Sequence, residues 1–399
     1  MSRVGVVHHV VKPLVAAASF AALAMPLHAG DLPALPAALQ QKLTRIANQM
    51  IAPTFAEGSR GEALSHRGLG FSLRIEVPSF APFELARGST SPDGKNPITP
   101  NTLLRIGSVT KTMTAVGVLK LVDDGKLSLD DTLEEFVPDC PNGGEITVRD
   151  LLAMSSGLPE YTDASFVVQW IDAPTAPYST LDTIATIRAG KPIFEPGSEV
   201  VYTNSNYVLL GEIIEIAAGT PWNSWEDWLM ANVITPAGLT STVIPKNQDT
   251  TLPTGAAGGW YFFEMEEPSR ELPAPGWHDT SRQTPDYAAS AGNAFSTAAD
   301  LSRWLDVLAT GALLTNETFA AQMTFRPFSG VEGSEYGLGI LRGGGLLGHS
   351  GEVLGSKSEM YLVPDLGVKL IIIAEGGDDE FAPADYIGDL LNAILQWEW

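Results

Sequence analysis

The chain has 399 residues, and its 47 Asp and Glu side chains against 24 Lys and Arg give a formal net charge of −23 at pH 7. Such an acidic surface repels phosphate backbones and anionic lipid, which argues against a nucleic-acid partner and against peripheral membrane binding. Cys140 is the only cysteine, which excludes an internal disulfide, and it lies far in sequence from His66, His278 and His349, so we predict no catalytic metal and no cofactor.

The first 29 residues have the pattern of a secretory signal peptide. Arg3 and Lys12 precede an apolar run from Pro13 to Leu27, and small residues follow up to Gly30. The apolar run is shorter than the roughly 20 residues that span a membrane, which disfavours the alternative of a retained N-terminal anchor. We therefore expect cleavage near residue 30, a periplasmic or secreted location, no stable membrane anchor and a net charge of −25 for the remaining chain.

Strand and helix patterns occur near both ends of the chain. Residues 36–50 predict a helix, and the short apolar segments 71–77 and 83–85, which are bounded by prolines, predict two strands. From Ser108 onward, apolar residues recur every three or four positions until Gly125, which predicts a helix. The last part of the sequence predicts three strands and an amphipathic helix, at residues 346–349, 358–362, 368–374 and 386–397.

The middle of the chain predicts helices joined by long loops. Residues 146–154, 206–218 and 222–233 have helical patterns, and three tryptophans between 222 and 228 favour a packed helix face over an aromatic substrate site. The aromatic segment 258–279 has two interpretations, a wall of the substrate pocket or a long loop packed on the helical lobe.

These patterns predict the fold class α/β (α+β), an antiparallel sheet flanked by helices with an inserted, mostly helical lobe. We expect one domain over residues 30–399, with an α/β lobe built from about 35–125 plus 308–399 and a helical lobe from about 126–307. A catalytic cleft is expected between the lobes, where pockets commonly form.

Ser108 and Lys111 form an S-x-x-K motif at the start of a predicted helix. The three-residue step places the serine hydroxyl and the lysine amine on one helix face. A serine becomes a nucleophile when a base takes its proton, and a partly buried lysine with a lowered pKa either does that itself or polarises a second base. The first turn of a helix also offers backbone N–H groups that can stabilise an oxyanion.

An S-x-x-K tetrapeptide occurs often by chance, so two further motifs are needed to support a catalytic role for Ser108. Tyr202 and Asn204 form Y-x-N, in which a phenol beside an ammonium can ionise more easily and act as general base, while the Asn204 amide offers an acceptor to Lys111 and a donor to a substrate carbonyl. The alternative is a turn Asn that caps a helix beside a core Tyr.

The third motif lies on a predicted strand. His349 and Ser350 are expected to contact the substrate and Tyr202, and the strand after Gly351 supplies a second oxyanion donor, the backbone N–H near Glu352. The alternative interpretation is a surface strand with a hydrogen-bonded histidine.

Together the three motifs resemble the S-x-x-K, Y-x-N and K-T-G boxes of the serine β-lactamase and penicillin-binding-protein superfamily, which includes class C β-lactamases, D-alanyl-D-alanine carboxypeptidases, D-aminopeptidases and family VIII esterases. The resemblance extends over about residues 104–375 and includes RIGSVTKTMTAVGVLKLVDDGKLSLDD, ITVRDLLAMSSGLPEYT, SAGNAFSTAADLSRWL and YGLGILRGGGLLGHSGEVLG. It implies Ser108 as nucleophile with Lys111 and Tyr202 as its activating partners.

His349 in place of the third-box lysine is most similar to the carboxypeptidase and D-aminopeptidase branch, and that resemblance implies that Phe166 and Tyr287 line the cleft. The sequence departs from the branch at Met154 and Ser155, where many members have His-Thr, and at Glu352, where carboxypeptidases usually have Thr.

The resemblance implies a serine hydrolase that forms an acyl-enzyme with an amide or ester, most like a D-alanyl-D-alanine carboxypeptidase. The alternatives are a β-lactamase, an esterase, a D-aminopeptidase, and a penicillin-binding sensor with negligible turnover. Its partner is a small-molecule or peptide substrate. A G-x-S-x-G hydrolase is disfavoured because the sequence contains no such motif.

Overall fold

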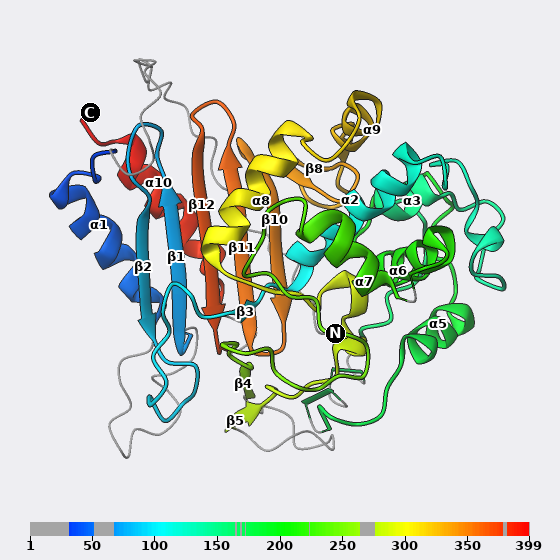
Figure 1. Cartoon of the computed structure of the whole chain (residues 1–399), viewed down its shortest axis with the longest axis horizontal. Coiled ribbons are helices and arrows are strands. Elements are labelled where there is room, and N and C mark those ends of the chain that lie inside the picture. The colour runs from blue at the N-terminus through cyan, green and yellow to red at the C-terminus, as the bar shows by residue number, and fades with distance from the viewer. Residues whose placement is uncertain are drawn as a thin grey trace.

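An eight-stranded antiparallel sheet forms the centre of the molecule, and segments from both ends of the chain contribute to it (Figure 1). The computed structural model describes residues 32–51, 68–163, 166–167, 170–171, 173–222, 224–263, 276–377 and 381–398. The expected signal peptide at residues 1–29 lies outside the described residues.

The strand order places the N-terminal hairpin beside the last strand of the sheet. The order is β2-β1-β12-β11-β10-β9-β8-β7, and each strand is antiparallel to its neighbours. The strands are β1 (Gly70–Glu76), β2 (Phe83–Gly88), β7 (Arg326–Pro327), β8 (Ser334–Tyr336), β9 (Leu341–Gly343), β10 (Leu346–Val353), β11 (Ser356–Val363) and β12 (Val368–Glu375).

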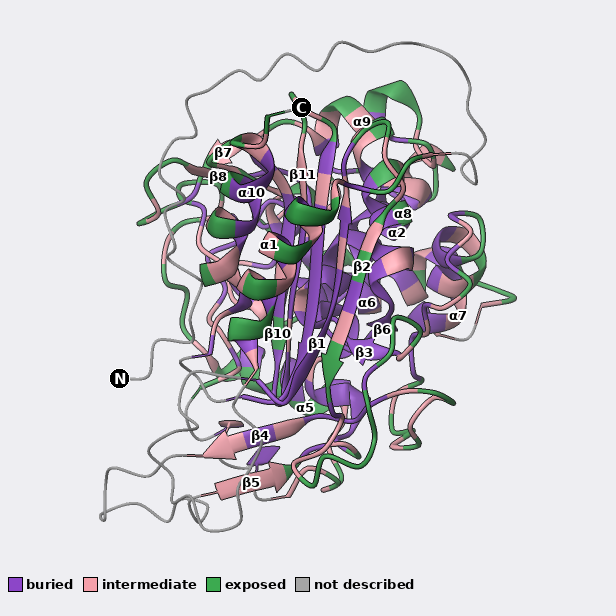
Figure 2. Ribbon diagram, turned by 90° about the vertical axis from the view of Figure 1, so that its left-hand side faces the viewer, coloured by how far each residue is buried: buried purple, intermediate pink, exposed green. Residues whose placement is uncertain are grey.

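Alternation along β12 divides the core into two layers. Leu370 and Ile372 belong to the cluster under α1 (Ala37–Ala47) and α10 (Ile387–Leu395), whereas Ile371 and Ile373 belong to the large cluster on the other face. Successive side chains of a strand point to opposite faces, so an apolar run is what a sheet covered on both sides requires. Figure 2 shows the central strands buried beneath these helices.

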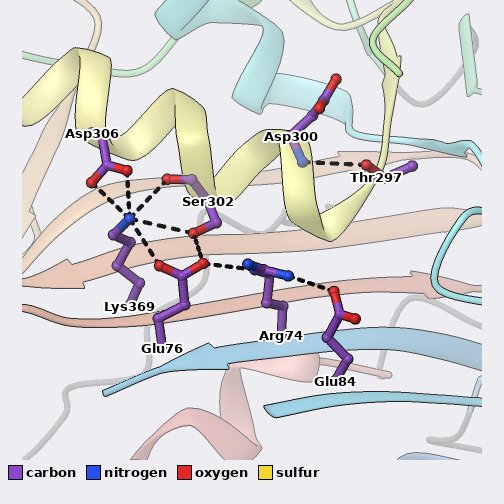
Figure 3. A network of polar contacts seen from close by, with 8 residues as sticks. All are labelled: Arg74, Glu76, Glu84, Thr297, Asp300, Ser302, Asp306 and Lys369. Carbon is purple, nitrogen blue, oxygen red and sulfur yellow. Dashed lines mark hydrogen bonds and ion pairs between the residues drawn. The ribbon is translucent and has the colours of Figure 1, made fainter. Parts of the chain in front are cut away.

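Helix α8 (Ala298–Thr310) crosses the second face of the sheet and contacts β1, β11 and β12 (Figure 1). A polar network, here called the α8 network, holds this helix on the sheet (Figure 3). Lys369 of β12 donates to Asp306 at 2.6 Å and lies 3.0 Å from Glu76 of β1. Ser302 donates to Glu76 at 2.7 Å. The predicted lobe boundary at 307 therefore falls within a helix that packs on the sheet.

The remaining helices surround α6, which is buried on nearly every side. Helices α2, α3, α5 and α7 contact α6 and bury most of its residues, whereas Ile216 is exposed and Glu212 and Glu215 are only partly buried. These helices are α2 (Thr110–Asp123), α3 (Val148–Leu152), α5 (Thr180–Ala189), α6 (Asn204–Ala218) and α7 (Trp225–Leu229), and α9 (Asn316–Gln322) lies near β7 and β8 in the chain. Two small ladders pair β3 (Leu104–Arg105) with β6 (Phe295–Ser296) and β4 (Trp260–Phe263) with β5 (Gly276–Asp279).

The structure confirms the predicted fold class and most predicted elements, with differences at helix ends. Helix α6 begins at 204 rather than 206 because the Thr203 side chain accepts from the Ser205 N–H. The segment predicted as one helix over 222–233 becomes α7, capped by Ser224, and a π-helical turn over 230–234. The expected packed tryptophan face is confirmed, since Trp225 and Trp228 are buried. No helix within the described ranges is long and apolar enough to cross a membrane.

Candidate functional site

Ser108 lies in a 3₁₀ turn (Gly107–Val109) that leads directly into α2. Two serines of β11 hold the chain that precedes it: Ser356 donates to the Arg105 carbonyl and Ser358 donates to the Ile106 carbonyl, each at 2.7 Å. The nucleophile candidate is therefore fixed against the sheet, while its own side chain remains half-buried and accessible.

Two glycines allow β10 to approach this turn closely. A Cβ at Gly351 would lie 2.0 Å from the Ile106 carbonyl oxygen and 2.9 Å from the Ser108 nitrogen, and a Cβ at Gly107, whose φ is +51°, would lie 2.5 Å from the Glu352 nitrogen. Only glycine fits such contacts without displacing the backbone. The amides of Ser108 and Glu352 are thus held near each other, and their role as oxyanion donors remains a prediction.

Lys111 is completely buried behind Ser108 and makes three hydrogen-bond contacts. Its Nζ lies 2.9 Å from Ser108 Oγ, 2.7 Å from Asn204 Oδ1 and 2.9 Å from the carbonyl oxygen of Ala291. Two of these partners are carbonyl oxygens, which only accept, so they take two N–H groups of the amine.

The contact between Lys111 Nζ and Ser108 Oγ determines which of the two groups donates the proton. Burial lowers the pKa of Lys111 to about 7, although the charge of Glu160 acts in the opposite direction. In the neutral amine, the lone pair that remains faces Ser108 Oγ, so the serine hydroxyl donates to Lys111. The geometry therefore favours Lys111 as the base that takes the proton of Ser108.

Tyr202 contributes a neutral phenol to the same site. Its hydroxyl is hydrogen-bonded to Ser108, and Lys111 Nζ lies 4.9 Å from the centre of its ring. We expected Tyr202 to ionise more easily beside an ammonium, but burial, together with Tyr336, raises its pKa well above the ordinary value. The environment thus favours a proton-carrying Tyr202 over a phenolate base.

Asn204 is the first residue of α6 rather than a loop residue, and the helix cap is Thr203. Its Oδ1 accepts from Lys111, in agreement with the sequence analysis. Its Nδ2 donates to Glu160 Oε2 at 3.2 Å and lies 3.5 Å from Thr162 Oγ1, and the expected contact with a substrate carbonyl remains a prediction. The backbone N–H of Asn204 donates to the same Glu160 oxygen at 2.7 Å.

His349 is buried, and it is hydrogen-bonded to Tyr336 rather than to Tyr202. Its Nδ1 donates to the Ser350 carbonyl at 2.5 Å, which leaves Nε2 as the acceptor for the Tyr336 hydroxyl at 3.1 Å, while the Tyr202 ring centre is 6.3 Å away. Burial lowers the pKa of His349 to about 3, so the ring is neutral. It therefore does not replace the charge of a third-box lysine.

The side chains of Ser350 and Glu352 face the other side of β10 from His349, as strand alternation requires. Ser350 is hydrogen-bonded to Tyr361, and the exposed Glu352 lies 3.1 Å from Lys357 of β11. The Lys357 contact partly compensates the negative charge of Glu352.

Arg342 of β9 could offset the charge of Glu352 only if the glycines at 343–345 folded it back toward that residue, but its side chain is engaged elsewhere. It pairs with Glu335 at 2.6 Å, and its guanidinium stacks 4.0 Å from the centre of the Phe325 ring. The intervening glycines therefore do not fold it back toward Glu352.

Phe166 and Tyr287, expected to line the cleft, lie in a buried aromatic cluster. Their rings are in edge contact at 5.4 Å, and both are buried. The Tyr287 carbonyl accepts from Tyr161, which follows Glu160 directly. The cluster thus supports the loop that carries Glu160, and a contact of Phe166 or Tyr287 with substrate remains a prediction.

The aromatic segment 258–279 forms the β4-β5 hairpin at one end of the sheet (Figure 1), and residues 264–275 lie outside the described ranges. Phe262 donates to the Gly377 carbonyl, and Thr280 donates to that of Leu354, in the β10-β11 turn. These contacts are with strand ends, while Tyr261 and Phe263 also pack in the large hydrophobic cluster that includes the helical lobe, so both interpretations of the segment stay open. Its role as a pocket wall remains a prediction.

The described residues contain no group of three or more His, Cys, Asp or Glu side chains that could hold a metal ion. The sequence analysis missed two residues, Glu160 and Tyr336, which each bind a predicted site residue. Glu160 lies within the segment ITVRDLLAMSSGLPEYT that supports the resemblance, but a single acid among 47 carries no signal by itself.

Comparison with known proteins gives one family. The profile of the family described as Beta-lactamase matches residues 60–393. A penicillin-binding protein of Bacillus subtilis (strain 168) is 30% identical over 187 residues, which cover 47% of this chain but only 36% of that protein. Penicillin-binding protein 4 of Amycolatopsis lactamdurans is 26% identical over 78% of this chain and 81% of its own length.

Solved structures share the fold over nearly their whole length. A D-amino acid amidase from Ochrobactrum anthropi, in complex with L-phenylalanine amide, has a TM-score of 0.72 at 25% identity. The match covers 90% of this chain and 99% of the amidase chain. A D-stereospecific amidohydrolase from Streptomyces has a TM-score of 0.69 at 25% identity, with 88% and 97% covered.

Proposed function

Because the chain belongs to the Beta-lactamase family of serine hydrolases, we propose that it cleaves amides or esters through an acyl-enzyme on Ser108. One observation carries this proposal: Ser108 Oγ lies 2.9 Å from a buried lysine amine whose other contacts include two carbonyl oxygens. The lone pair of that amine is thereby directed at the serine hydroxyl.

The proposed reaction needs only side chains of this chain and water. Ser108 Oγ attacks the carbonyl carbon while its proton passes to Lys111, and the oxyanion accepts from the amides of Ser108 and Glu352. Tyr202, which is a neutral phenol hydrogen-bonded to Ser108, gives its proton to the leaving nitrogen or oxygen and regains one from Lys111. Water then attacks the ester carbonyl by the reverse path, which releases the acid and restores Ser108.

For the substrate, we propose neutral or amine-bearing amides and esters, such as amides of D-amino acids. Glu160 and Glu352 bring negative charge to the site, and His349 supplies no positive charge. Two carboxylates about 4 Å apart repel by about 4 kcal/mol at an effective dielectric near 20, before the compensation by Lys357. The D-amino acid amidase and the D-stereospecific amidohydrolase among the structural neighbours support this choice.

The penicillin-binding relatives support a second candidate, a D-alanyl-D-alanine carboxypeptidase. A β-lactamase and a penicillin-binding sensor remain as variants of the same acylation chemistry that differ in the rate of deacylation. Burst kinetics with a chromogenic β-lactam separate them, because a sensor releases one equivalent and then stops.

The nucleophile is tested by covalent labelling. A fluorophosphonate or a fluorescent penicillin should label the wild type and leave Ser108→Ala unlabelled, because the attacking oxygen is gone. Ser198→Ala is the matched control, since Ser198 is exposed and its hydroxyl donates to the Glu195 carbonyl of its own turn. Equal labelling of Ser108→Ala and the wild type would refute the assignment.

The substrate preference is tested at Glu352. Glu352→Thr should raise kcat/KM for peptides with a free carboxylate beside the scissile bond, relative to neutral esters, by roughly tenfold or more, since removal of a repulsion of about 1.4 kcal/mol is already worth that factor. The two substrates are compared in both proteins. An unchanged ratio would return the carboxypeptidase to first place.

We also propose that the protein is exported, on the basis of residues 1–29 alone. N-terminal sequencing of the protein from a periplasmic or culture fraction should find a start near residue 30. An intact residue 1 in a membrane fraction would instead support the retained anchor.

A further inference from the structure

A carboxylate that has no part in the three motifs lies directly behind Asn204. Glu160 is half-buried in the loop that follows α3, and its Oε2 accepts from both the backbone N–H and the Nδ2 of Asn204, at 2.7 and 3.2 Å. Its Oε1 accepts from the Thr162 N–H at 3.0 Å, which fixes the side chain to its own loop. Both carboxylate oxygens are therefore committed to this position.

The amide of Asn204 has two ends of opposite character, and their assignment matters for Lys111. An ionised carboxylate only accepts, so the Nδ2 end must face Glu160 and the Oδ1 end must face Lys111. In the reversed orientation the NH₂ group would face Lys111 Nζ and donate to its lone pair. That lone pair would then be unavailable to the Ser108 hydroxyl.

We propose that Glu160 is a positioning residue that holds the Asn204 amide in one orientation and thereby keeps the amine of Lys111 directed at Ser108. The proposal rests on the proposed function of Ser108 and Lys111, and it assigns Glu160 no contact with the substrate. It explains why a carboxylate is present beside a base that works in its neutral form: its hydrogen bonds orient the amide next to that base.

The charge of Glu160 gives the proposal a second, measurable consequence. The groups that face Lys111 come from several elements: Glu160, Tyr202 before α6, Tyr207 on α6 with its ring centre 5.8 Å from Nζ, and His349 on β10. Burial keeps the two tyrosines and His349 uncharged, so Glu160 is the charged member of this set. Removal of its charge should lower the pKa of Lys111 further.

The test compares Glu160→Gln with the wild type and with Glu195→Gln, an exposed glutamate of the same region as a charge-matched control. The rate of labelling by a fluorophosphonate is measured from pH 5 to 10. The labelling rate of Glu160→Gln should be roughly 10- to 100-fold lower than that of the wild type, as when a residue that orients a ligand is removed. The limb of its pH profile should also move to lower pH, because the pKa of Lys111 falls. A residue that only supports the fold would change the amount of active protein and leave the limb in place.

A swap variant isolates the orientation of the amide. In Glu160→Gln with Asn204→Asp, residue 204 can only accept, so it must present an oxygen to Lys111, while the glutamine amide donates to its other oxygen. A carboxylate at residue 204 touches Lys111 directly and raises its pKa, so the two variants are compared above the limb of each pH profile. There the double variant should label at least tenfold faster than Glu160→Gln alone. If both variants label at the same rate, amide orientation is not what Glu160 provides, and the proposal is wrong.

Two further measurements keep the test decisive. NMR of ¹³C-labelled lysine follows the pKa of Lys111 without any substrate, so a wild type that is not labelled at Ser108 would refute the proposed function while the effect of Glu160 is still measured. An unchanged Lys111 pKa in Glu160→Gln would overturn the proposal. If Glu160→Gln does not fold, Glu160→Asp is used in its place. Its shorter side chain keeps the negative charge but moves the carboxylate away from Asn204 Nδ2. A labelling rate of Glu160→Asp equal to that of the wild type would also overturn the proposal.

Discussion

Two lysines of this molecule show how the surroundings decide what one side chain does. Lys369 in the α8 network lies among Glu76, Asp306 and Ser302, with its side chain 12% exposed (Figure 3). Although burial opposes it, hydrogen bonding from Ser302 and the charge of Lys369 lower the pKa of Glu76. Lys111 is fully buried, and its direct contacts are a hydroxyl, an amide oxygen and a carbonyl oxygen.

The difference lies in whether the carboxylate touches the lysine directly. In the α8 network the acids contact Nζ, so an ammonium is paired and fastens a helix to the sheet. At the site, Glu160 stands one residue further away, behind Asn204, and the amine keeps a pKa of about 7. The first arrangement stabilises a charged lysine that holds two elements together, and the second favours the neutral amine that we propose as the base.

The largest effect expected from this comparison is on acylation. Lys111→Met should lower the labelling rate at Ser108 by roughly 10² or more, and Tyr202→Phe should do the same, because each residue handles the same proton. The double variant should lose little beyond either single change. Lys369→Met serves as the control and should label at the wild-type rate; fully additive losses at 111 and 202 would contradict the shared role.

The pH dependence of acylation follows from the neutral amine. With the pKa of Lys111 at about 7, the base is protonated below that pH, so the labelling rate should fall about tenfold per pH unit below pH 7 and level off above it. Stopped-flow labelling between pH 5 and 9 measures the limb, which should vanish in Lys111→Met. A rate that decreases as the pH rises through 7 would show that the ammonium form is required, and would restore Tyr202 as the base.

The smallest expected effect is on stability. Lys369→Met should lower the free energy of unfolding by about 1 kcal/mol, because the pair is partly exposed and screened. The pKa of Glu76 is lowered in the fold, so its contribution is present above its ordinary value of 4.5 and is lost as the pH falls through the lowered value. Urea unfolding at pH 7 and pH 3 measures this; an equal deficit at both values would assign the loss to packing instead.

Periodicity predicted the parts of the fold that bury a repeated pattern. The strands near both ends and the helix after Ser108 follow from their apolar residues, because burial on a sheet or inside a bundle imposes spacing. Helix α5 was not predicted, although Ser179 and Asp182 form a capping box at its start. Helix α8 has a comparable signal, since the Thr297 side chain accepts from the Asp300 N–H.

The sequence predicted the site residues that belong to short motifs, but not those whose contacts join segments far apart in the sequence. Ser108 and Lys111 are three residues apart, whereas Glu160 and Tyr336 reach Asn204 and His349 only through the fold. The direction of the Tyr202 pKa shift could not be predicted from the sequence either, because the residues that bury Tyr202 are not identified by any local pattern.

The strand order also determines how much of the chain must be present before the proposed site is complete. Ser108 and Lys111 emerge early, but the strand that places Glu352 beside them, β10, is held in a sheet that closes only when β12 pairs with β1. Such long-range pairing slows folding, since the chain must close a large loop first. A polypeptide that stopped before residue 346 would contain Ser108 and Lys111 but lack β10, so we expect it to be unable to complete the proposed site.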